Sequence, residues 1–499
     1  MDRQRKKKIQ NIRIIITNIL MAISVIGIVF ILMLIAMGYS FNEDGGLEQS
    51  GLAQISSRPK GATVEIDGET QFGHTDISKM LSSGDHRVKI SKKGYDSWEK
   101  TIKVDPGLLT RVEWARLFPI KADTSTVTKF DNLRLVEFSS NRKYLFVIEH
   151  DAPNAYYINI QGDKINSQKF SLLKALGGDK ENVLEGTLNL VAWNESDNKA
   201  LFTWTRNEKT TWHLFDLENA EKSVNLSKKY GMDFTDIRIA NDSASKLWAL
   251  EKGNVHIIDL SNQTISGILI RDVEQLSNNK DVIAYVGTDS TDGDMRKISI
   301  FKEGEKGSTA IMDIEDKKAP VTMAMGTYWN ESWLAFSVGN RIHIQSGTYP
   351  SFDKPSKDNL KELVKRDLEY TPTLASTNRL SRIVAFAGSC NLTAIDIETH
   401  NYYDSITETE LAKINWLDGY LIWENANNKI VVRDFDGENR REILSVNNQH
   451  TVNITENNRW LYYFETKEAD VDSNGNVKDK TDNTTPAETI YLLKRQKLE

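Results

Sequence analysis

The 499-residue sequence contains a single cysteine, Cys390. With one thiol the chain forms no intrachain disulfide. No cysteine follows the apolar run near the N-terminus, which excludes a lipoprotein anchor. Cys390 closes the segment Ala385-Phe386-Ala387-Gly388-Ser389, a setting that predicts a small buried residue at a strand end. A catalytic thiol would need a histidine partner, and the sequence suggests none.

The sequence also lacks the short motifs of common hydrolases and metalloenzymes. It has no Gly-x-Ser-x-Gly, His-Glu-x-x-His or Cys-x-x-Cys pattern, and its eight histidines are scattered singly. His213, His256 and His343 each lie inside an apolar strand pattern, which predicts outward-facing or edge positions. Three histidines from different strands could still meet at a central channel, so a metal site there stays open as an alternative. We expect no catalytic residue and no cofactor other than calcium.

Positive charge is scarce outside the first residues. The net charge is −7, but residues 1–13 carry six basic residues and one acidic residue, so the rest of the chain carries −12. An acidic exterior argues against nucleic acid and against anionic lipid surfaces as partners. Solubility is a sufficient reason for this charge.

A run without charged residues extends from Ile14 to Phe41. About 20 mostly apolar residues cross the hydrocarbon core of a bilayer, so the run predicts a transmembrane helix over residues 14–41. By the positive-inside rule, the basic stub of residues 1–13 lies in the cytoplasm and everything after residue 42 lies outside. A cleaved signal peptide is the alternative, but its apolar core usually has about 7–15 residues. We therefore expect a retained signal-anchor.

A small all-β unit is predicted after the anchor. Residues 42–52 are polar and are predicted to be a short flexible linker. Residues 53–118 then alternate apolar and polar side chains between turns at Pro59-Lys60-Gly61, Asp67-Gly68 and Lys93-Gly94-Tyr95.

This unit resembles the PEGA family, and we call it the PEGA-like module. Pro59-Lys60-Gly61-Ala62 stands at the place of the signature tetrapeptide of that family, with Lys60 in place of the usual Glu. Asp76 also departs from the family pattern, which has Pro after the Thr. The other matching positions are Val64, Ile66-Asp67-Gly68, Gly73, Thr75, Gly84-Asp85-His86 and Lys93-Gly94-Tyr95. The resemblance implies a small β-sandwich of surface and envelope proteins of bacteria and archaea, without catalytic residues.

Two histidines of the module, His74 and His86, have no carboxylate or cysteine partner at metal-ligand spacing. They are predicted to be surface or turn residues rather than metal ligands.

From residue 119 to residue 499 the same pattern of two apolar strands recurs eight times. The period is about 45 residues, within the range of propeller blades. No amphipathic helix separates the strands, so the fold class is mainly β, with a β-propeller of eight blades and seven as the alternative. The first strand of each pair contains Phe146, Phe202, Trp248, Ile283, Ala335, Val384, Ile422 or Tyr462, and the second contains Tyr157, Leu214, Ile257, Ser299, His343, Ala394, Val431 or Tyr491.

Several repeats begin with a turn such as Phe138-Ser139-Ser140-Asn141-Arg142-Lys143. This resembles the W-S-P-D-G-K phrase of TolB-type propellers, with the Pro and Gly mostly missing, and it implies the fold rather than a function. The last repeat ends at Leu493, which leaves too few residues for a fourth strand. We therefore predict that Ser125–Phe130, before the first repeat, supplies the outer strand of the final blade and closes the ring.

The best candidate metal site is an acidic loop in the last repeat. Its oxygen-bearing residues follow the spacing of an EF-hand-type calcium loop, with Gly475 at position six. Position twelve is Thr481 instead of Glu, so a solvated hairpin insertion is the alternative. The candidate calcium ligands are Asp470, Asp472, Asn474 and Asn476, and a weaker acidic loop contains Asp289, Asp292 and Asp294.

Eleven tryptophans invite a carbohydrate-binding interpretation, but nine of them lie in the repeats, where most are predicted to pack between blades. We expect a membrane-anchored extracytoplasmic binding or scaffold protein of the prokaryotic cell envelope. Its propeller loops would bind an envelope protein, a peptide or cell-wall glycan, and not nucleic acid. The alternatives are an extracytoplasmic hydrolase or lyase with a site in the propeller channel, and a purely structural envelope component.

Overall fold

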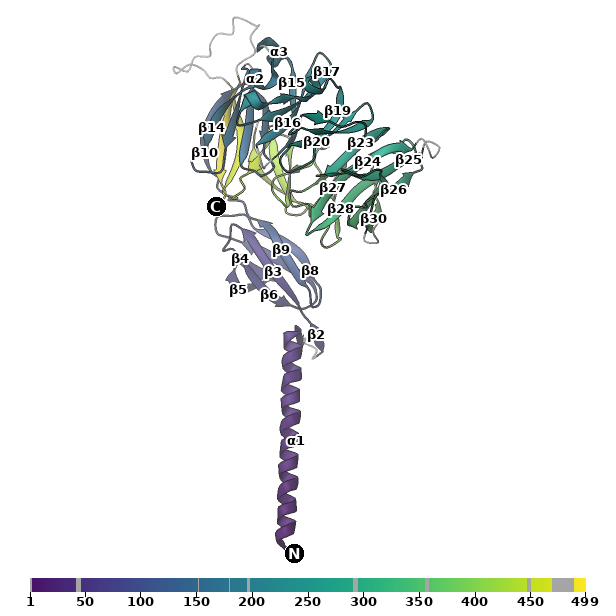
Figure 1. The fold of residues 1–499 in the computed structure, drawn as a ribbon. Helices are drawn as coiled ribbons and strands as arrows, with labels where there is room; N and C mark the ends of the chain where they lie inside the picture. The colour runs from purple at the N-terminus through teal and green to yellow at the C-terminus, as the bar shows by residue number, and fades with distance from the viewer. Residues whose placement is uncertain are drawn as a thin grey trace, which may run out of the picture. The chain divides into compact units, whose positions relative to one another are not determined.

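The computed structural model describes residues 2–41, 46–150, 152–178, 180–194, 198–289, 295–354, 359–446, 450–468 and 489–499. The chain divides into two compact units, Met1–Lys121 and Ala122–Glu499. The first unit contains a long helix and the PEGA-like module, and the second contains the repeats (Figure 1).

The long helix, α1 (Asp2–Ala36), includes the predicted transmembrane run. Its segment Arg13–Ile35 is long and apolar enough to cross a membrane, and none of that segment is buried in the protein. Thr17 and Ser24 each donate a hydrogen bond of 2.9 Å to the carbonyl four residues earlier. These bonds satisfy the two hydroxyls inside the helix, as expected for polar groups in an apolar run.

The helix ends earlier than the uncharged run predicts. Gly38 adopts a φ of 79°, which is typical of a helix C-terminus. β1 (Tyr39–Phe41) then pairs with β2 (Leu47–Gln49). Part of the segment expected to be a flexible linker, residues 42–52, is therefore in β2 and in the start of the next strand, β3.

The PEGA-like module consists of two sheets around one apolar core. Trp98 and Val64 are fully buried in it, and Tyr95 packs against it. Strands β3 and β9 pair in parallel, while the other pairs are antiparallel. The sheets are β6-β3-β9 and β5-β4-β7-β8, with β3 (Gly51–Arg58), β4 (Thr63–Ile66), β5 (Glu69–His74), β6 (Ile77–Leu81), β7 (Gly84–Ser91), β8 (Trp98–Val104) and β9 (Leu109–Arg116). Two facing sheets with a shared core form the expected small sandwich.

The described residues of the second unit form eight antiparallel four-stranded sheets, one for each predicted repeat. Sheets 1 to 4 are β11 (Leu133–Phe138), β12 (Tyr144–Glu149), β13 (Asn154–Asn159), β14 (Asn166–Ser171); β15 (Thr187–Trp193), β16 (Lys199–Arg206), β17 (Lys209–Asp216), β18 (Val224–Asn225); β19 (Phe234–Ile239), β20 (Lys246–Glu251), β21 (Asn254–Asp259), β22 (Thr264–Ile265); and β23 (Val273–Asn279), β24 (Val282–Asp289), β25 (Met295–Lys302), β26 (Thr309–Ile314).

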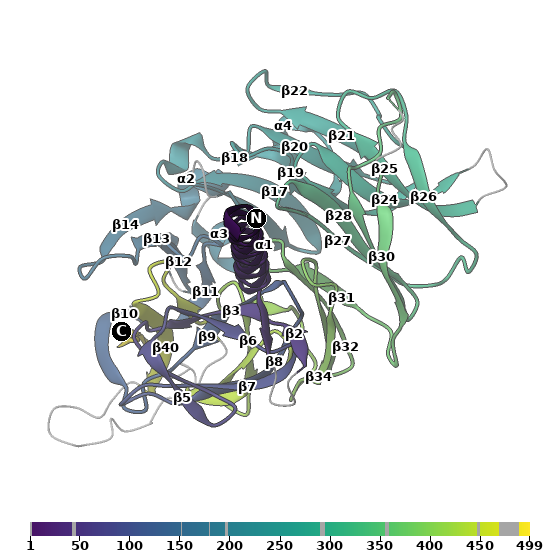
Figure 2. The same ribbon diagram turned by 90° about the horizontal axis from the view of Figure 1, so that it is seen from below.

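Sheets 5 to 8 are β27 (Val321–Tyr328), β28 (Glu331–Val338), β29 (Arg341–Gly347), β30 (Lys361–Asp367); β31 (Leu374–Thr377), β32 (Ile383–Gly388), β33 (Asn391–Asp396), β34 (Tyr402–Ile406); β35 (Asn415–Trp416), β36 (Leu421–Ala426), β37 (Lys429–Asp434), β38 (Arg441–Ser445); and β39 (Asn453–Ile454), β40 (Trp460–Glu468), β41 (Thr489–Lys497), β10 (Asp123–Asp131). The two apolar strands predicted in each repeat are the second and third strands of its sheet. The sheets follow one another around a common centre in the order of the sequence (Figure 2).

Strand β10 closes the ring, as predicted. It pairs with β41 along its whole length, from Asp123 opposite Lys497 to Asp131 opposite Ile490. The yellow C-terminal strands and the blue β10 therefore lie side by side in Figure 1, although they are more than 350 residues apart in sequence. The eighth sheet is thus built from both ends of the unit.

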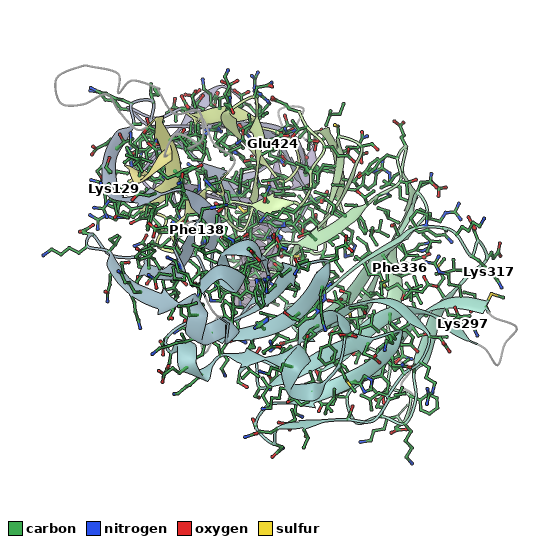
Figure 3. The ribbon with its side chains drawn as sticks, turned by 90° about the horizontal axis from the view of Figure 1, so that it is seen from above. Lys129, Phe138, Lys297, Lys317, Phe336 and Glu424 are labelled. Atoms are coloured by element: carbon green, nitrogen blue, oxygen red, sulfur yellow. The ribbon has the colours of Figure 1, made fainter. Side chains whose placement is uncertain are left out.

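Apolar clusters join neighbouring sheets. One cluster packs Phe130 and Phe464 of the eighth sheet against Leu145 of the first, and similar clusters join the first six sheets in sequence. The first strands contact one another between sheets (β11 with β15, β23 with β27, β27 with β31), which places them on the inner side. Phe138 of β11 accordingly lies nearer the centre than Lys129 of β10 (Figure 3).

In the described part of the second unit, three short α-helices and one 3-10 helix (Ala220–Lys222) lie between strands, and none is long enough to be the amphipathic helix whose absence the sequence indicates. α2 (Leu172–Leu176) and α3 (Lys180–Glu185) connect the first sheet to the second, and α4 (Leu226–Tyr230) connects the second to the third. A side-chain cap from Ser171 begins α2 and one from Asn225 begins α4, and a left-handed glycine ends each of these two helices. Helices of five or six residues are too short to show a 3.6-residue apolar period.

Candidate functional site

The turns between the first and second strands of the sheets gather at one end of the ring. We call this end the AB face. Its described turns are residues 139–143, 240–245, 280–281, 329–330, 378–382, 417–420 and 455–459.

Side-chain oxygens shape these turns. In the first sheet, Ser139 Oγ donates to Asn141 Oδ1 (2.7 Å) and accepts from the backbone N–H of Tyr144 (3.0 Å). Thr455 and Asn457 repeat this arrangement in the eighth sheet, and a single asparagine accepts the equivalent N–H groups in the third and sixth sheets. The degraded W-S-P-D-G-K phrase therefore corresponds to a turn held by its own polar side chains.

Hydrogen bonds and ion pairs connect successive turns of the AB face. The Asn194 amide donates to the Asp242 carbonyl (2.8 Å), and Lys280 Nζ lies 3.1 Å from the Asp242 carboxylate. At the closure, Lys143 pairs with Glu456 at 3.0 Å. Contacts of this kind between sheets make the AB face a fixed surface rather than a set of independent loops.

Trp329 is the most exposed tryptophan of the described residues and lies on the AB face, in the two-residue turn between β27 and β28. Its side chain is 75% exposed. Trp329 and Asn330 have φ values of 47° and 67°, a conformation that is costly for a tryptophan. The base of the turn is fixed, because the Tyr328 hydroxyl donates to Glu398 (2.9 Å), which also pairs with Arg382 (2.8 Å).

A second large apolar side chain lies on the neighbouring turn. Leu380, in the turn between β31 and β32, is 47% exposed. Leu380 is the third residue of its turn, the position that Asn141 occupies in the turn of the first sheet. Two contacts join the Leu380 turn to the fifth sheet, because Trp333 Nε1 in β28 donates to the carbonyl of Ser381 (2.8 Å) and Arg382 pairs with Glu398, which accepts from Tyr328. Trp329 and Leu380 therefore present apolar surface from adjacent, rigidly joined turns.

A polar pocket of about 390 Å³ opens among the turns of the second, third and fourth sheets. Trp193, Arg238, Asp242 and Lys280 are among the residues that line it. The pocket thus combines charges of both signs with an aromatic ring.

Two carboxylates on inner strands have a pKa that burial raises. Burial raises the pKa of Asp236 in β19, although Arg238 Nε lies 3.0 Å from its carboxylate. Burial likewise raises the pKa of Glu137 in β11, although Lys413 lies 3.8 Å away. Each carboxylate thus has a basic partner of its own.

The three strand histidines do not meet. His213 in β17, His256 in β21 and His343 in β29 occupy third strands of three different sheets. The prediction that they face outward or lie at an edge is wrong, because all three are buried. Burial lowers the pKa of His213 to about 4, so its ring is neutral near pH 7. His343 stacks on Phe336, and its Nδ1 lies 3.0 Å from Glu362.

The candidate calcium ligands Asp470, Asp472, Asn474 and Asn476 lie outside the described residues, as do Asp292 and Asp294 of the weaker loop. Within the described ranges, no group of three or more His, Cys, Asp or Glu side chains is placed to hold a metal ion.

Cys390 is not the buried residue that the sequence predicts. It is half-buried and lies in the two-residue turn between β32 and β33, where Ser389 and Cys390 have φ values of 50° and 62°.

Most of the nine tryptophans in the repeats are packed in the core, as the sequence predicts, and Trp329 is the clear exception. The sequence did contain a sign of this exposure, because Trp329 is followed by Asn330 between two apolar strands, and asparagine is typical of a turn.

In the PEGA-like module, His86 is buried rather than on the surface. Its Nδ1 lies 2.6 Å from the Asp67 carboxylate and its Nε2 lies 2.9 Å from the Ser82 carbonyl. Burial opposes the charged ring, but the bonds to Asp67 and Ser82 outweigh it and raise the pKa of His86 above 6.5. The bond to His86 lowers the pKa of Asp67. His74 is exposed, as expected.

The comparisons with known proteins agree with this division of the chain. Residues 50–115 match the model of the PEGA domain. The match covers the PEGA-like module and confirms the resemblance drawn from its turns. The two departures from the family pattern contact each other, because Lys60 Nζ lies 2.7 Å from the Asp76 carboxylate. Comparison with curated proteins finds no match.

Solved structures similar to the chain include β-propellers of low sequence identity. Hsv2 from Kluyveromyces lactis is 11% identical, with 69% of this chain and 96% of that chain covered and a TM-score of 0.38. Apo AztD from Citrobacter koseri is 11% identical, with 78% and 96% covered and a TM-score of 0.38. The β-propeller domain of Cps50 (Swd1) from Myceliophteria thermophila is 11% identical, with 65% and 99% covered and a TM-score of 0.39.

Proposed function

We propose that this protein is a membrane-anchored, extracytoplasmic binding protein that docks a protein or peptide partner on the AB face of its propeller. The observation that carries the proposal is the pair of exposed apolar side chains, Trp329 and Leu380, on adjacent turns of a rigid surface. Tryptophan is among the residues that contribute most to protein interfaces. A fixed surface also loses little conformational freedom when it binds.

The N-terminal helix supports attachment to a membrane. None of Arg13–Ile35 is buried in the protein, and the segment has the length and composition of a membrane span. The basic residues before it favour a cytoplasmic N-terminus, so the PEGA-like module and the propeller would lie on the outer side of the cell membrane. The PEGA-like module would then act as a spacer.

A binding role is favoured over catalysis by the chemistry of the inner strands. Among the described residues of the inner strands, Asp236 and Glu137 have a pKa that burial raises, and each carboxylate faces its own basic side chain. A general acid and base pair needs carboxylates that act on one substrate. The strand histidines lie on three different sheets, away from a shared site.

The proposal is tested with the full-length protein purified in detergent and used to capture solubilised envelope proteins. We expect Trp329→Ala and Leu380→Ala to abolish capture of a partner that the wild type retains. Ile406→Ala is the matched control, because Ile406 is also a large exposed apolar residue but lies at the opposite end of its sheet. Capture that survives both AB-face substitutions, or that is lost equally in the control, would exclude the AB face. Retention of cell-wall glycan alone would exclude a protein partner.

The topology is tested in intact cells with an impermeant thiol reagent. In a Cys390→Ser background, a cysteine at Thr70 should be labelled, and one at Gln4 only after permeabilisation. The reverse pattern would contradict the proposed orientation, and loss of the N-terminal residues from the mature protein would show a cleaved signal peptide.

A further inference from the structure

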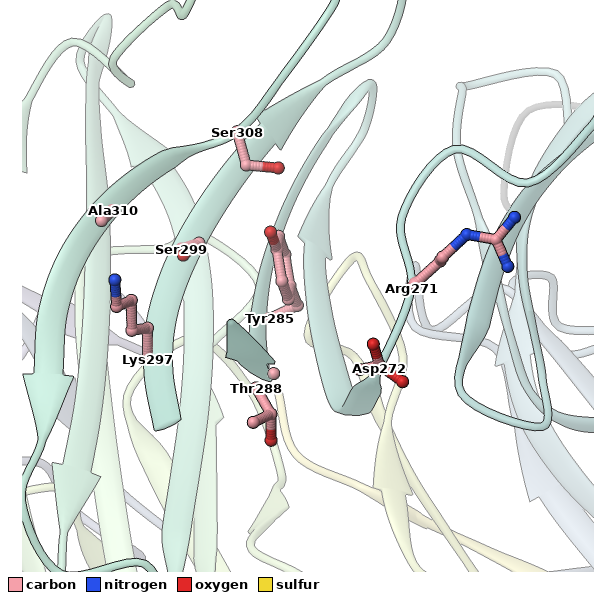
Figure 4. A pocket seen from close by; sticks show the side chains of 9 residues that line it. Arg271, Asp272, Tyr285, Thr288, Lys297, Ser299, Ser308 and Ala310 are labelled. Atoms are coloured by element: carbon pink, nitrogen blue, oxygen red, sulfur yellow. The ribbon is translucent and has the colours of Figure 1, made fainter. Parts of the chain in front are cut away.

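A separate pocket of about 290 Å³ lies on the fourth sheet. Its walls come from β24, β25 and β26 and from the segment that precedes β23 (Figure 4). Tyr285, Ser299 and Ala310 form one cross-strand row over β24, β25 and β26. Side chains in such a row lie on the same face of the sheet. The row places a phenol ring and a hydroxyl next to a methyl group, and the small side chains leave the hollow.

Hydroxyl-bearing side chains line this pocket. Tyr285 is 9% exposed and Ser299 is 7% exposed. Within the described part of the chain, no hydrogen bond joins the side-chain hydroxyls of Tyr285, Ser299 or Ser308 to another protein group, and the Thr288 side chain points away from them (Figure 4). The oxygen atoms of these side chains are reached by solvent rather than sealed inside the protein, so they are open to the hollow. The accessible hydroxyls of Tyr285, Ser299 and Ser308 around one hollow can form hydrogen bonds with a molecule from outside the chain.

The pocket is also closed at its base. A Cβ on Gly287 would lie 2.9 Å from the backbone oxygen of Asp272 and 3.2 Å from the Tyr285 ring. Glycine at this position therefore permits the close approach that forms the base. Lys297, opposite Gly287 on β25, supplies a cationic donor, and Asp272 supplies an acceptor. In Figure 4 the side chain of Arg271 points away from these groups.

The chemistry of these groups selects the class of ligand. Hydroxyls that both donate and accept, one charged donor and one charged acceptor match the hydroxyl groups of a sugar ring, and the Tyr285 ring provides an apolar surface. A phosphate would face the Asp272 carboxylate. An apolar ligand would leave the hydroxyls without any partner. We propose that this pocket binds one sugar ring of a glycan, at a site distinct from the AB face and independent of the function proposed for that face.

The test uses the full-length protein in lipid nanodiscs, because sugar-headed detergents would compete. Saturation-transfer NMR and calorimetry measure binding of glucose, galactose, mannose, N-acetylglucosamine and inorganic phosphate. We expect at least one sugar to bind with a millimolar Kd. Tyr285→Phe combined with Ser299→Ala should weaken that binding about tenfold, as expected for the loss of two hydrogen bonds. Tyr402→Phe, which removes an exposed phenol elsewhere, should leave it unchanged.

Three outcomes would overturn the inference. The first is that no sugar of the panel binds at concentrations of about 50 mM, well above a millimolar Kd. The second is that phosphate binds and the sugars do not, which would make the pocket an anion site. The third is sugar binding whose affinity is the same in the wild type and in the double variant. Thermal unfolding of each variant verifies that the propeller remains folded.

Discussion

Closure of the ring by β10 leads to a quantitative prediction for Phe130. Phe130 is the one residue of β10 that is buried, with 4% of its surface exposed. Its ring centroid lies 5.4 Å from that of Tyr156 in the first sheet and 6.2 Å from that of Phe464 in the eighth. The side chain therefore joins β10 to both sheets at the closure. Removal of a buried phenylalanine side chain costs about 3–5 kcal/mol, so Phe130→Ala should destabilise the propeller by that amount.

Guanidinium unfolding followed by tryptophan fluorescence measures this effect, because nine of the eleven tryptophans lie in the repeats. Lys129→Ala is the control. Lys129 is an exposed neighbour on the same strand, and a surface substitution of this kind changes stability by about 0.5 kcal/mol or less.

Hydrogen exchange adds a local measurement. Opening of the closure should increase exchange in β41, the partner of β10, more than in the distant strands β24 and β25. If Phe130→Ala costs less than about 1 kcal/mol, well below the range for a buried phenylalanine, and leaves exchange in β41 unchanged, β10 does not hold the ring closed.

Three further predictions concern other parts of the molecule. Asp67→Asn should lower the pKa of His86 in an NMR titration. The stability that His86 contributes to the wild-type module should be full below about pH 6.5 and lost as pH rises through its raised pKa. Arg433→Met should destabilise the propeller to guanidinium by about 3–5 kcal/mol, because it leaves the buried Glu424 carboxylate without its cationic partner. Cys390→Gly should raise the guanidinium midpoint, with a gain of about 1 kcal/mol, because glycine adopts the positive φ of this turn without strain.

The central strands of the propeller were predictable because each is an apolar segment of a few residues bounded by polar turns. The second and third strands of all eight sheets follow this pattern, and both are covered by neighbouring sheets. The outer strands are shorter or more polar, as in β22 (Thr264–Ile265), so the pattern does not reveal them. β10 was predictable by a different argument, since a four-stranded repeat that lacks a strand at one end of the unit must find it at the other.

The turns show why the propeller phrase was only partly recognisable. In the W-S-P-D-G-K phrase the fifth residue is glycine. In four turns of the AB face the residue at this position has a positive φ but is not glycine, and these residues are Arg142, Ala244, Ser381 and Asn458. The backbone conformation is thus maintained without the residue that usually marks it. Side-chain bonds such as those of Ser139 and Asn141 compensate for part of the strain.

The residues of the two proposed binding sites could not be predicted from the sequence, because their surroundings depend on which side chains the neighbouring strands place beside them. Ser299 alternates with Ile298 and Ile300, a pattern that indicates a solvent-facing serine, yet it is buried in a pocket beside Tyr285. Trp329 shows the opposite case, since tryptophans in the repeats are mostly core residues and this one is exposed at a turn. In this chain the repeat of apolar strands determines which residues form the sheets. The proposed binding residues are those whose burial differs from what the repeat predicts, and the three-dimensional arrangement is needed to show that difference.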